Sequence, residues 1–163
     1  DVCSSDLKLS SDLKSKATLI LAKVGIARKS YQDAEDYLIE LVNGIKDETA
    51  AEANYELGKL YYLNEKYKTS LQTLFELNKN FAQYDQWLGK SFLLIADNYL
   101  AQEELFQAKA TLNSIIENAE DDDLKRQAAE KLTQLEELEK EVVLPQDSTV
   151  VNDSTSNQNG NNE

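Results

Sequence analysis

Two pairs of carboxylates in this sequence have a spacing that general acid–base chemistry could use. Asp33 precedes Asp36 by three residues, and Glu136 precedes Glu139 by the same interval. Side chains three residues apart lie on one face of a helix, so each pair could donate and accept a proton at one site. Exposed helices carry such pairs routinely, and neither pair is accompanied by residues that would form a cleft or perturb a pKa. We therefore expect that the protein is not an enzyme.

Other residues that could do chemistry are few. Histidine is absent, which removes the commonest general base and every Ser–His or Cys–His nucleophile pair. The consecutive residues Asp121, Asp122 and Asp123 could supply carboxylates to calcium, but they lack the ligand spacing of an EF-hand loop. We expect them to cap the N-terminus of a helix instead. The sequence thus predicts no metal site and no cofactor.

Charge limits the classes of partner. The 163 residues include 17 lysines and arginines and 30 aspartates and glutamates, for a net charge of −13. Because nucleic acids and anionic lipids are bound through clustered cations, we expect no nucleic acid partner. The longest apolar runs, 19–22 and 92–96, are far shorter than the roughly 18 residues of a membrane span. We also expect no direct insertion into a membrane.

Hydrophobic periodicity predicts the fold class. Apolar residues recur at intervals of three and four from Leu13 to Leu138, which is the pattern of an all-α protein. The only proline is Pro145, and the segment that follows it is rich in Asn and Ser and has no aromatic residue. Such a segment cannot bury enough apolar surface to offset its ordering entropy. We therefore predict that residues 144–163 form a disordered tail.

Three segments of the chain align with one another, at spacings of 36 and 38 residues. The middle one reads EANYELGKLYYLNEKYKTSLQTLFEL. Each segment has small residues at two fixed places and large apolar residues around them. The first small position holds Ala22, Gly58 and Ala96, and the second holds Ala34, Ser70 and Ala108. The large residues include Leu21, Leu57 and Ile95 before the first position, and Leu38, Leu74 and Leu112 after the second. We predict two helices per segment, packed closely at the small residues.

This pattern resembles the tetratricopeptide repeat, a helix–turn–helix unit that stacks into a superhelix. The middle segment matches best, through Leu57, Gly58, Tyr61, Tyr67, Ser70, Leu74 and Leu77, with Ser70 in place of the usual Ala. The first segment has Gly25 where the family has an aromatic residue, and no segment ends in the family's proline. The resemblance implies an all-α helical-repeat solenoid over residues 12–143. It would contain three repeats, at about 15–46, 51–84 and 88–120, and a capping helix at 124–142.

The resemblance also implies a site for a protein or peptide partner. Such repeats bind partners on a concave surface, which the first helix of each repeat lines. The matching positions are Lys16, Lys23, Tyr55, Lys59, Tyr62, Leu63, Lys90, Leu93, Asp97 and Leu100. Lysines beside tyrosines and leucines would suit a peptide with acidic and apolar side chains. An equally weighted alternative is that Tyr55 and Tyr62 pack on the neighbouring helix.

One known function of the family is excluded by the sequence. Some members hold the C-terminal carboxylate of heat-shock chaperones with a clamp of Lys, Asn and Arg residues. The matching positions here are Leu19, Lys23, Glu56, Lys90 and Leu94. Only Lys90 fits the clamp, and Glu56 would repel a carboxylate. We therefore do not expect a chaperone adaptor of this kind.

The first residues of the chain suggest a fragment. DVCSSDL can be encoded by the end of a common sequencing adapter, so we interpret residues 1–7 as an artefact within a non-native or disordered lead, 1–11. The rest resembles the C-terminal end of long bacterial tetratricopeptide proteins of the Bacteroidetes type. That resemblance implies possible upstream repeats and favours a periplasmic or cell-envelope location over the cytoplasm. An alternative function follows: the segment would be the structural end of a longer solenoid, without a groove of its own.

Overall fold

The computed structural model describes the backbone of residues 2–143 and the side chains of residues 10–140. This part of the chain contains helices and no strand, which confirms the predicted all-α class. The helices are α1 (Val2–Ala27), α2 (Tyr31–Val42), α3 (Glu48–Leu63), α4 (Tyr67–Asn80), α5 (Asp85–Ala101), α6 (Leu105–Asn118) and α7 (Asp122–Val143). The tail predicted at 144–163 lies outside the described residues.

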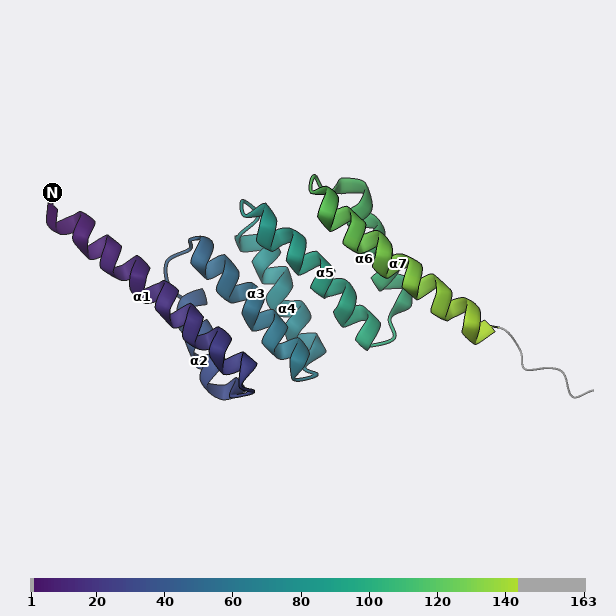
Figure 1. The fold of residues 1–163 in the computed structure, drawn as a ribbon, viewed down its shortest axis with the longest axis horizontal. Helices are drawn as coiled ribbons and strands as arrows, with labels where there is room; N and C mark the ends of the chain where they lie inside the picture. Colours follow the sequence, from purple (N-terminus) through teal and green to yellow (C-terminus); the bar gives the residue numbers. More distant parts are fainter. Residues whose placement is uncertain (1, 144–163) are drawn as a thin grey trace, which may run out of the picture.

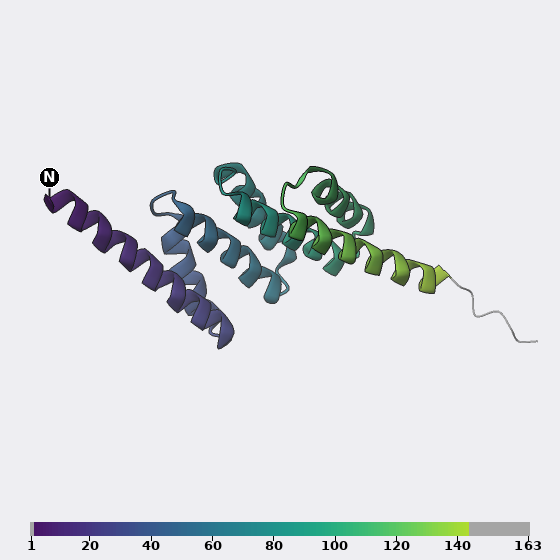
Figure 2. The same cartoon turned by 45° about the horizontal axis from the view of Figure 1, so that its top comes forward.

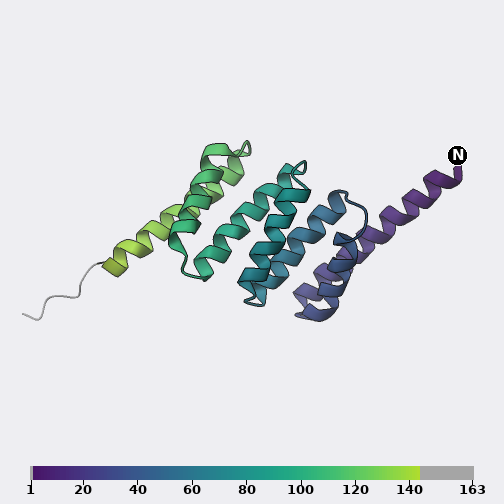
Figure 3. The same ribbon diagram turned by 180° about the vertical axis from the view of Figure 1, so that it is seen from behind.

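The helices form two layers (Figures 1 and 3). Each helix packs against the next one along the chain, so α1–α2, α3–α4 and α5–α6 are antiparallel pairs. In addition, α1 contacts α3, α3 contacts α5, and α5 contacts α7. The helices α2, α4 and α6 make no contact with one another within residues 2–143. One layer is therefore a continuous row of the odd-numbered helices, and the other consists of separated even-numbered helices.

The same turn joins the two helices of each pair. Lys29, Glu65 and Glu103 all have left-handed backbone conformations, with φ of 62°, 58° and 60°. The amide that follows each of them donates to the carbonyl five residues earlier, at 2.9 Å in all three turns. This is the Schellman arrangement, which satisfies the free carbonyls at a helix C-terminus. The turns recur at the spacings of 36 and 38 residues that relate the three sequence segments.

The small residues lie where the helices of a pair meet. Ala22, Ala34, Ser70, Ala96 and Ala108 are fully buried. Gly58 is also buried, and a Cβ added there would lie 2.7 Å from Leu74. The large residues Leu38, Leu74 and Leu112 are fully buried beside them. Close approach at small positions therefore fixes the packing of each pair, as the sequence predicts.

One predicted core position behaves differently. Leu57 and Ile95 are 6% and 2% exposed, but Leu21 is 52% exposed. This position faces the preceding helix pair: Leu57 packs in one cluster with residues of α1 and α2, and Ile95 packs with Leu74 of α4. No helix precedes α1 in the described residues, so Leu21 has no partner. Its expected burial is wrong for that reason.

The N-terminal half of α1 extends beyond α2, and the C-terminal end of α7 extends away at the opposite end (Figure 2). The non-native or disordered lead predicted over residues 1–11 overlaps α1, which is helical from Val2. No glycine or proline precedes Gly25, so nothing in the sequence interrupts a helix there. The non-native origin of residues 1–7 stays a prediction.

Local capping signals position α3 and α7. The carboxylate of Asp47 accepts a 2.9 Å hydrogen bond from the Ala50 amide, so Asp47 is the N-cap of α3. At α7, the carboxylate of Asp121 accepts from the amides of Asp123 and Leu124, at 2.8 Å and 3.3 Å. This confirms the helix-capping role expected for the Asp run.

Candidate functional site

The ten residues predicted to bind a partner all lie on α1, α3 and α5. We call the surface formed by α1, α3, α5 and α7 the odd-helix surface. Consecutive helices of this layer contact one another, so side chains from separate repeats become neighbours across it. Lys16 and Lys23 lie on α1, where Lys16 is exposed. The remaining eight residues are divided between α3 and α5, and their surroundings differ.

Tyr55 and Tyr62 pack against neighbouring aromatic rings. The Tyr55 ring centroid lies 5.7 Å from that of Trp87 on α5, and the Tyr62 centroid lies 5.7 Å from that of Tyr67 on α4. Both tyrosines are partly buried and keep part of their surface open to solvent. Inter-helix packing and surface exposure therefore occur together at these positions, as expected of an amphipathic side chain.

Asp97 lies near both tyrosines. Burial raises the pKa of Tyr55 and of Tyr62, and the negative charge of Asp97 raises both pKa values further. The Lys131 ammonium on α7 donates a 2.6 Å hydrogen bond to Asp97, and the two side chains form an ion pair. Residues of α3, α5 and α7 thus converge on one part of the odd-helix surface.

The predicted lysines have three different environments. Lys23 forms an ion pair with Glu52 of α3. Lys59 lies 3.4 Å from Glu56, one helical turn before it, so its charge is partly offset. The Lys90 ammonium lies 4.3 Å from the centre of the Trp87 ring, in cation–π geometry. Carboxylates therefore accompany two of the four predicted lysines, and the surface is mixed in charge rather than basic.

The three predicted leucines also differ. Leu63 is exposed and Leu100 is half-buried. Leu93 is only 8% exposed, because it packs in one cluster with Leu112 and Ile115 of α6 and Ala128 of α7. Leu93 is thus a core residue in this structure and does not lie on the surface with the others.

Two residues that contact side chains of this surface were not predicted from the sequence. Lys131 completes the ion pair with Asp97, and Trp87 supports both Tyr55 and Lys90. Trp87 could have been noticed because it is the only tryptophan. Lys131 had no signal in the repeat pattern, because it lies on the final helix, outside the three repeats.

The residues considered for catalysis lie elsewhere. Asp36 accepts a hydrogen bond from Gln32 on its own helix, and Glu139 pairs with Lys109 of α6. Their neighbours Asp33 and Glu136 are exposed. Among the described side chains, no group of three potential metal-ligating residues is placed to hold a metal ion. No helix of the described part has the length and hydrophobicity required to cross a membrane.

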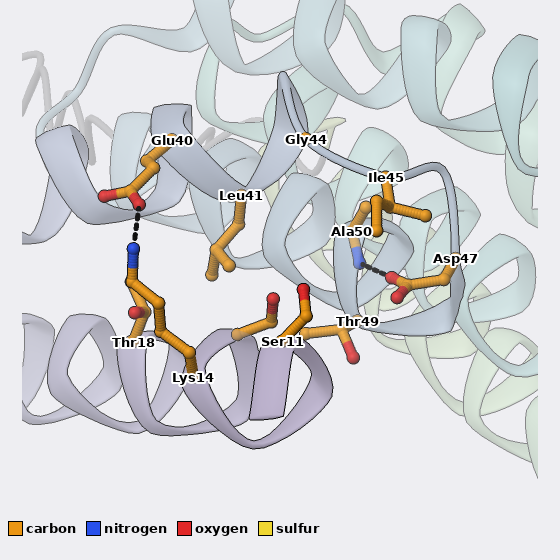
Figure 4. Close-up of a pocket in the computed structure, with 11 residues that line it drawn as sticks. Ser11, Lys14, Thr18, Glu40, Leu41, Gly44, Ile45, Asp47, Thr49 and Ala50 are labelled. Atoms are coloured by element: carbon orange, nitrogen blue, oxygen red, sulfur yellow. Dashed lines mark hydrogen bonds and ion pairs between the residues drawn. The ribbon is translucent and has the colours of Figure 1, made fainter. Parts of the chain in front are cut away.

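A small pocket of about 240 Å³ lies between α1, α2 and the start of α3 (Figure 4). Lys14 of α1 reaches Glu40 of α2 at 3.5 Å beside it, and both side chains are exposed. Thr18, Leu41 and Ile45 are among its other lining residues. None of the ten predicted residues lines this pocket, so it is separate from the odd-helix surface.

Comparison with known proteins gives no information on the family or function of this chain. No protein-family model matches the chain, and no curated protein matches it.

Proposed function

We propose that the protein is a tetratricopeptide-like helical-repeat scaffold that binds a protein or peptide partner on the odd-helix surface, without catalysis. Three observations support the repeat architecture. The Schellman turns recur at the spacings of the sequence repeats, the small residues are buried at equivalent places, and the odd-numbered helices form a continuous row. In an array of this kind, one layer presents equivalent faces of successive repeats to a ligand.

The observation that carries the binding proposal is the convergence of Tyr55, Tyr62 and Asp97 beside Lys59 and Lys90. Partly exposed aromatic rings on a packed support are good anchors for a partner, because they contribute contact area at little entropic cost. The cations beside them would steer carboxylates of a peptide that also has apolar side chains. The carboxylates of Glu56 and Asp97 would select against a uniformly acidic peptide.

The proposal is tested by selecting binders from a displayed library of random peptides with the purified chain. Selected peptides are then measured against Lys59→Glu and against the double variant Lys59→Ala with Tyr62→Ala. We expect both changes to weaken binding about tenfold or more, as loss of an interface anchor does. The matched control replaces Tyr37 and Lys68 by Ala on α2 and α4, outside the odd-helix surface. Undiminished binding of every selected peptide to folded variants of Lys59 and Tyr62 would refute the site.

A specific observation also favours the second candidate, a structural end of a longer solenoid. Ile20, Leu21 and Val24 of α1 are exposed, whereas their repeat equivalents on α5 are Leu94, Ile95 and Asn98, which are all buried against the preceding pair. The exposed face of α1 is thus the face through which later repeats pack on their predecessors. Adding a folded helical pair upstream of α1 should raise the unfolding midpoint and protect Leu21 amide exchange. An added pair that leaves both unchanged would argue against this role.

A further inference from the structure

Two junctions in the molecule connect equivalent helices of successive repeats, through residues 81–84 in one and 119–121 in the other. In the middle junction, α4 is followed by α5, which also contacts α3. In the final junction, α6 is followed by α7, which also contacts α5. Helix α4 ends at Asn80 and helix α6 ends at Asn118, and the residue that follows each helix, Phe81 or Ala119, donates its amide to the carbonyl four residues earlier, at 2.9 Å. The two residues are 38 positions apart, which is the repeat spacing. Phe81 and Ala119 therefore occupy equivalent positions in the repeats, although their backbone conformations differ, with ψ of 29° and 144°.

A second pair of equivalents faces them. Trp87 is the third residue of α5, and Leu124 is the third residue of α7. Trp87 packs with Leu77 and Phe81, whereas Leu124 packs with Ile115 and Ala119. Two aromatic side chains of the middle junction are thus replaced by Ala119 and Leu124 in the final junction.

The exchange changes the space inside the junction. In the middle junction, Phe81 and Trp87 are 1% and 7% exposed, so aromatic rings fill it. In the final junction, a cleft of about 540 Å³ opens between α5, α6 and α7. Its apolar lining comes from Leu88, Phe92, Ile115, Ala119 and Leu124. The start of α5 and the α6–α7 connection lie at the same edge of the molecule (Figure 1), and the cleft is formed between them.

The rim of the cleft is acidic. Asp85, Glu120 and Asp121 line it, and none of its lining residues is basic. The Asp121 carboxylate is engaged by the amides of α7, but Asp85 and Glu120 are exposed. A ligand with an apolar group and adjacent positive charges complements both the lining and the rim.

We propose that this cleft binds an aromatic side chain within a basic segment of a partner protein. The middle junction shows that the space between equivalent helices accommodates aromatic rings when Phe81 and Trp87 supply them. Burying a ring in the cleft would cover apolar surface that the protein itself leaves uncovered, and the neighbouring cations would pair with Asp85 and Glu120. The cleft shares no residue with the ten predicted binding residues of α1, α3 and α5, so the two proposals fail or succeed independently.

A second copy of the chain is a poor occupant through its most exposed aromatic side chain. Its most exposed aromatic side chain among the described residues is Phe106, at 82%. Phe106 follows Glu103 and Glu104, whose charges would meet the carboxylates of the rim. Like charges at close range oppose such a contact.

The probe is a labelled synthetic peptide, acetyl-Lys-Lys-Gly-Trp-Gly-Lys-Lys-amide, and binding to the full chain is measured by fluorescence anisotropy. Two matched peptides replace the Trp by Ala or all the Lys by Glu. We expect the first replacement to weaken binding about thirtyfold and the second to abolish it, as expected for an aromatic anchor with charge complementarity. Equal binding of the Trp and Ala peptides would overturn the proposal, because charge alone would then explain the affinity.

Variants of the chain locate the binding. Ala119→Phe adds an aromatic ring to the lining of the cleft, and it should reduce binding of the Trp peptide at least about tenfold. Ala110→Phe, at an exposed position of α6, is the size-matched control and should bind as the natural chain does. Glu120→Gln together with Asp85→Asn leaves the volume of the cleft unchanged and should weaken binding of the same Trp peptide severalfold. Glu117→Gln, outside the cleft, should leave its binding unchanged. Unchanged binding to both cleft variants, or concentration-dependent dimerisation that is lost in Ala119→Phe, would assign the cleft to something else.

Discussion

The hydroxyl of Ser70 donates a 2.7 Å hydrogen bond to the carbonyl oxygen of Gly58. These residues occupy the two small positions of the α3–α4 pair, and both are buried. Because Gly58 has no Cβ, α4 lies close enough to α3 for a side-chain hydroxyl to reach the backbone. The bond satisfies a polar group that burial would otherwise leave unpaired. It explains how Ser70 can stand where the other pairs have Ala34 and Ala108.

We expect Gly58→Ala to destabilise the protein. A Cβ at this position would lie 2.7 Å from Cδ2 and 2.9 Å from Cγ of Leu74, which is fully buried. Alanine improves helix propensity by about 1 kcal/mol, but overpacking costs about 1–3 kcal/mol. The free energy of unfolding should therefore fall by up to about 2 kcal/mol, measured by urea denaturation.

Gly89→Ala is the matched comparison for that change. Its Cβ would lie 2.6 Å from Cδ2 of Leu124, but the other Leu124 carbons are 3.5 Å and 3.6 Å away. Leu124 borders the cleft and can rotate into it, so we expect stability to be unchanged or raised by up to about 1 kcal/mol. Equal losses of stability in the two glycine variants would show that Leu124 has no more room to move beside Gly89 than Leu74 has beside Gly58.

Local patterns predicted the helices and their close contacts, because periodicity and residue size act over one or two turns. The buried positions of Ala22, Gly58 and Ala96 follow directly from that pattern. The left-handed turns at Lys29, Glu65 and Glu103 did not, since none of these residues is a glycine or asparagine. Tertiary packing of the two helices imposes a backbone conformation there that local preference disfavours.

The candidate site was less predictable than the fold. The resemblance gave the helix faces, but burial of Leu93 depends on Ala128, which lies 35 residues later on α7. The partners of the charged residues are also distant in sequence, as in the pair of Asp97 with Lys131. Such contacts depend on how neighbouring helices are placed, which spacing within a single repeat does not determine.

We expect Leu57→Ala and Leu21→Ala to have very different costs, although the residues are repeat equivalents. Leu57 is 6% exposed and packs against α1 and α2, so its truncation should cost about 2–5 kcal/mol of unfolding free energy. Leu21 is 52% exposed, so the same truncation should cost less than about 0.5 kcal/mol. Thermal and urea denaturation of the two variants measure the difference. Similar losses in both would mean that the Leu21 face is covered in solution.

Stability should fall at alkaline pH because of Tyr61. Burial, together with a 2.8 Å hydrogen bond donated to Glu35 and the negative charge of that carboxylate, raises the pKa of Tyr61 to about 12. Because the folded-state pKa lies above the unfolded value of about 10, this stabilisation is fully present below pH 10 and is lost as the pH rises towards 12. The loss should be at most about 2–3 kcal/mol.

Urea denaturation at a series of alkaline pH values measures this dependence, and Tyr61→Phe is the control. The phenyl ring keeps the packing but cannot ionise, so the Phe variant should be slightly less stable near neutral pH and should lose less stability at high pH. Parallel pH profiles for the two proteins would show that Tyr61 does not cause the alkaline loss.

Asp97 should control the ionisation of the tyrosines on the odd-helix surface. Burial is the largest cause of the raised pKa of Tyr55 and Tyr62, followed at Tyr55 by the charge of Glu56. The charge of Asp97 also raises both, so Asp97→Asn should lower both pKa values. Lys131→Gln should raise them, because it removes the cation that lies 2.6 Å from Asp97. NMR titration of the tyrosine ring carbons follows each residue separately, with Tyr37 of α2 as a reference remote from this surface.

The same two variants measure the strength of the α5–α7 ion pair. Both side chains are only partly exposed, so a double-mutant cycle should give a coupling free energy of up to about 1 kcal/mol that decreases with added salt. A coupling near zero with an unchanged Tyr62 titration would mean that Asp97 points away from both α3 and α7. The convergence on which the binding proposal depends would then be absent, and the odd-helix surface would lose its strongest argument as a site.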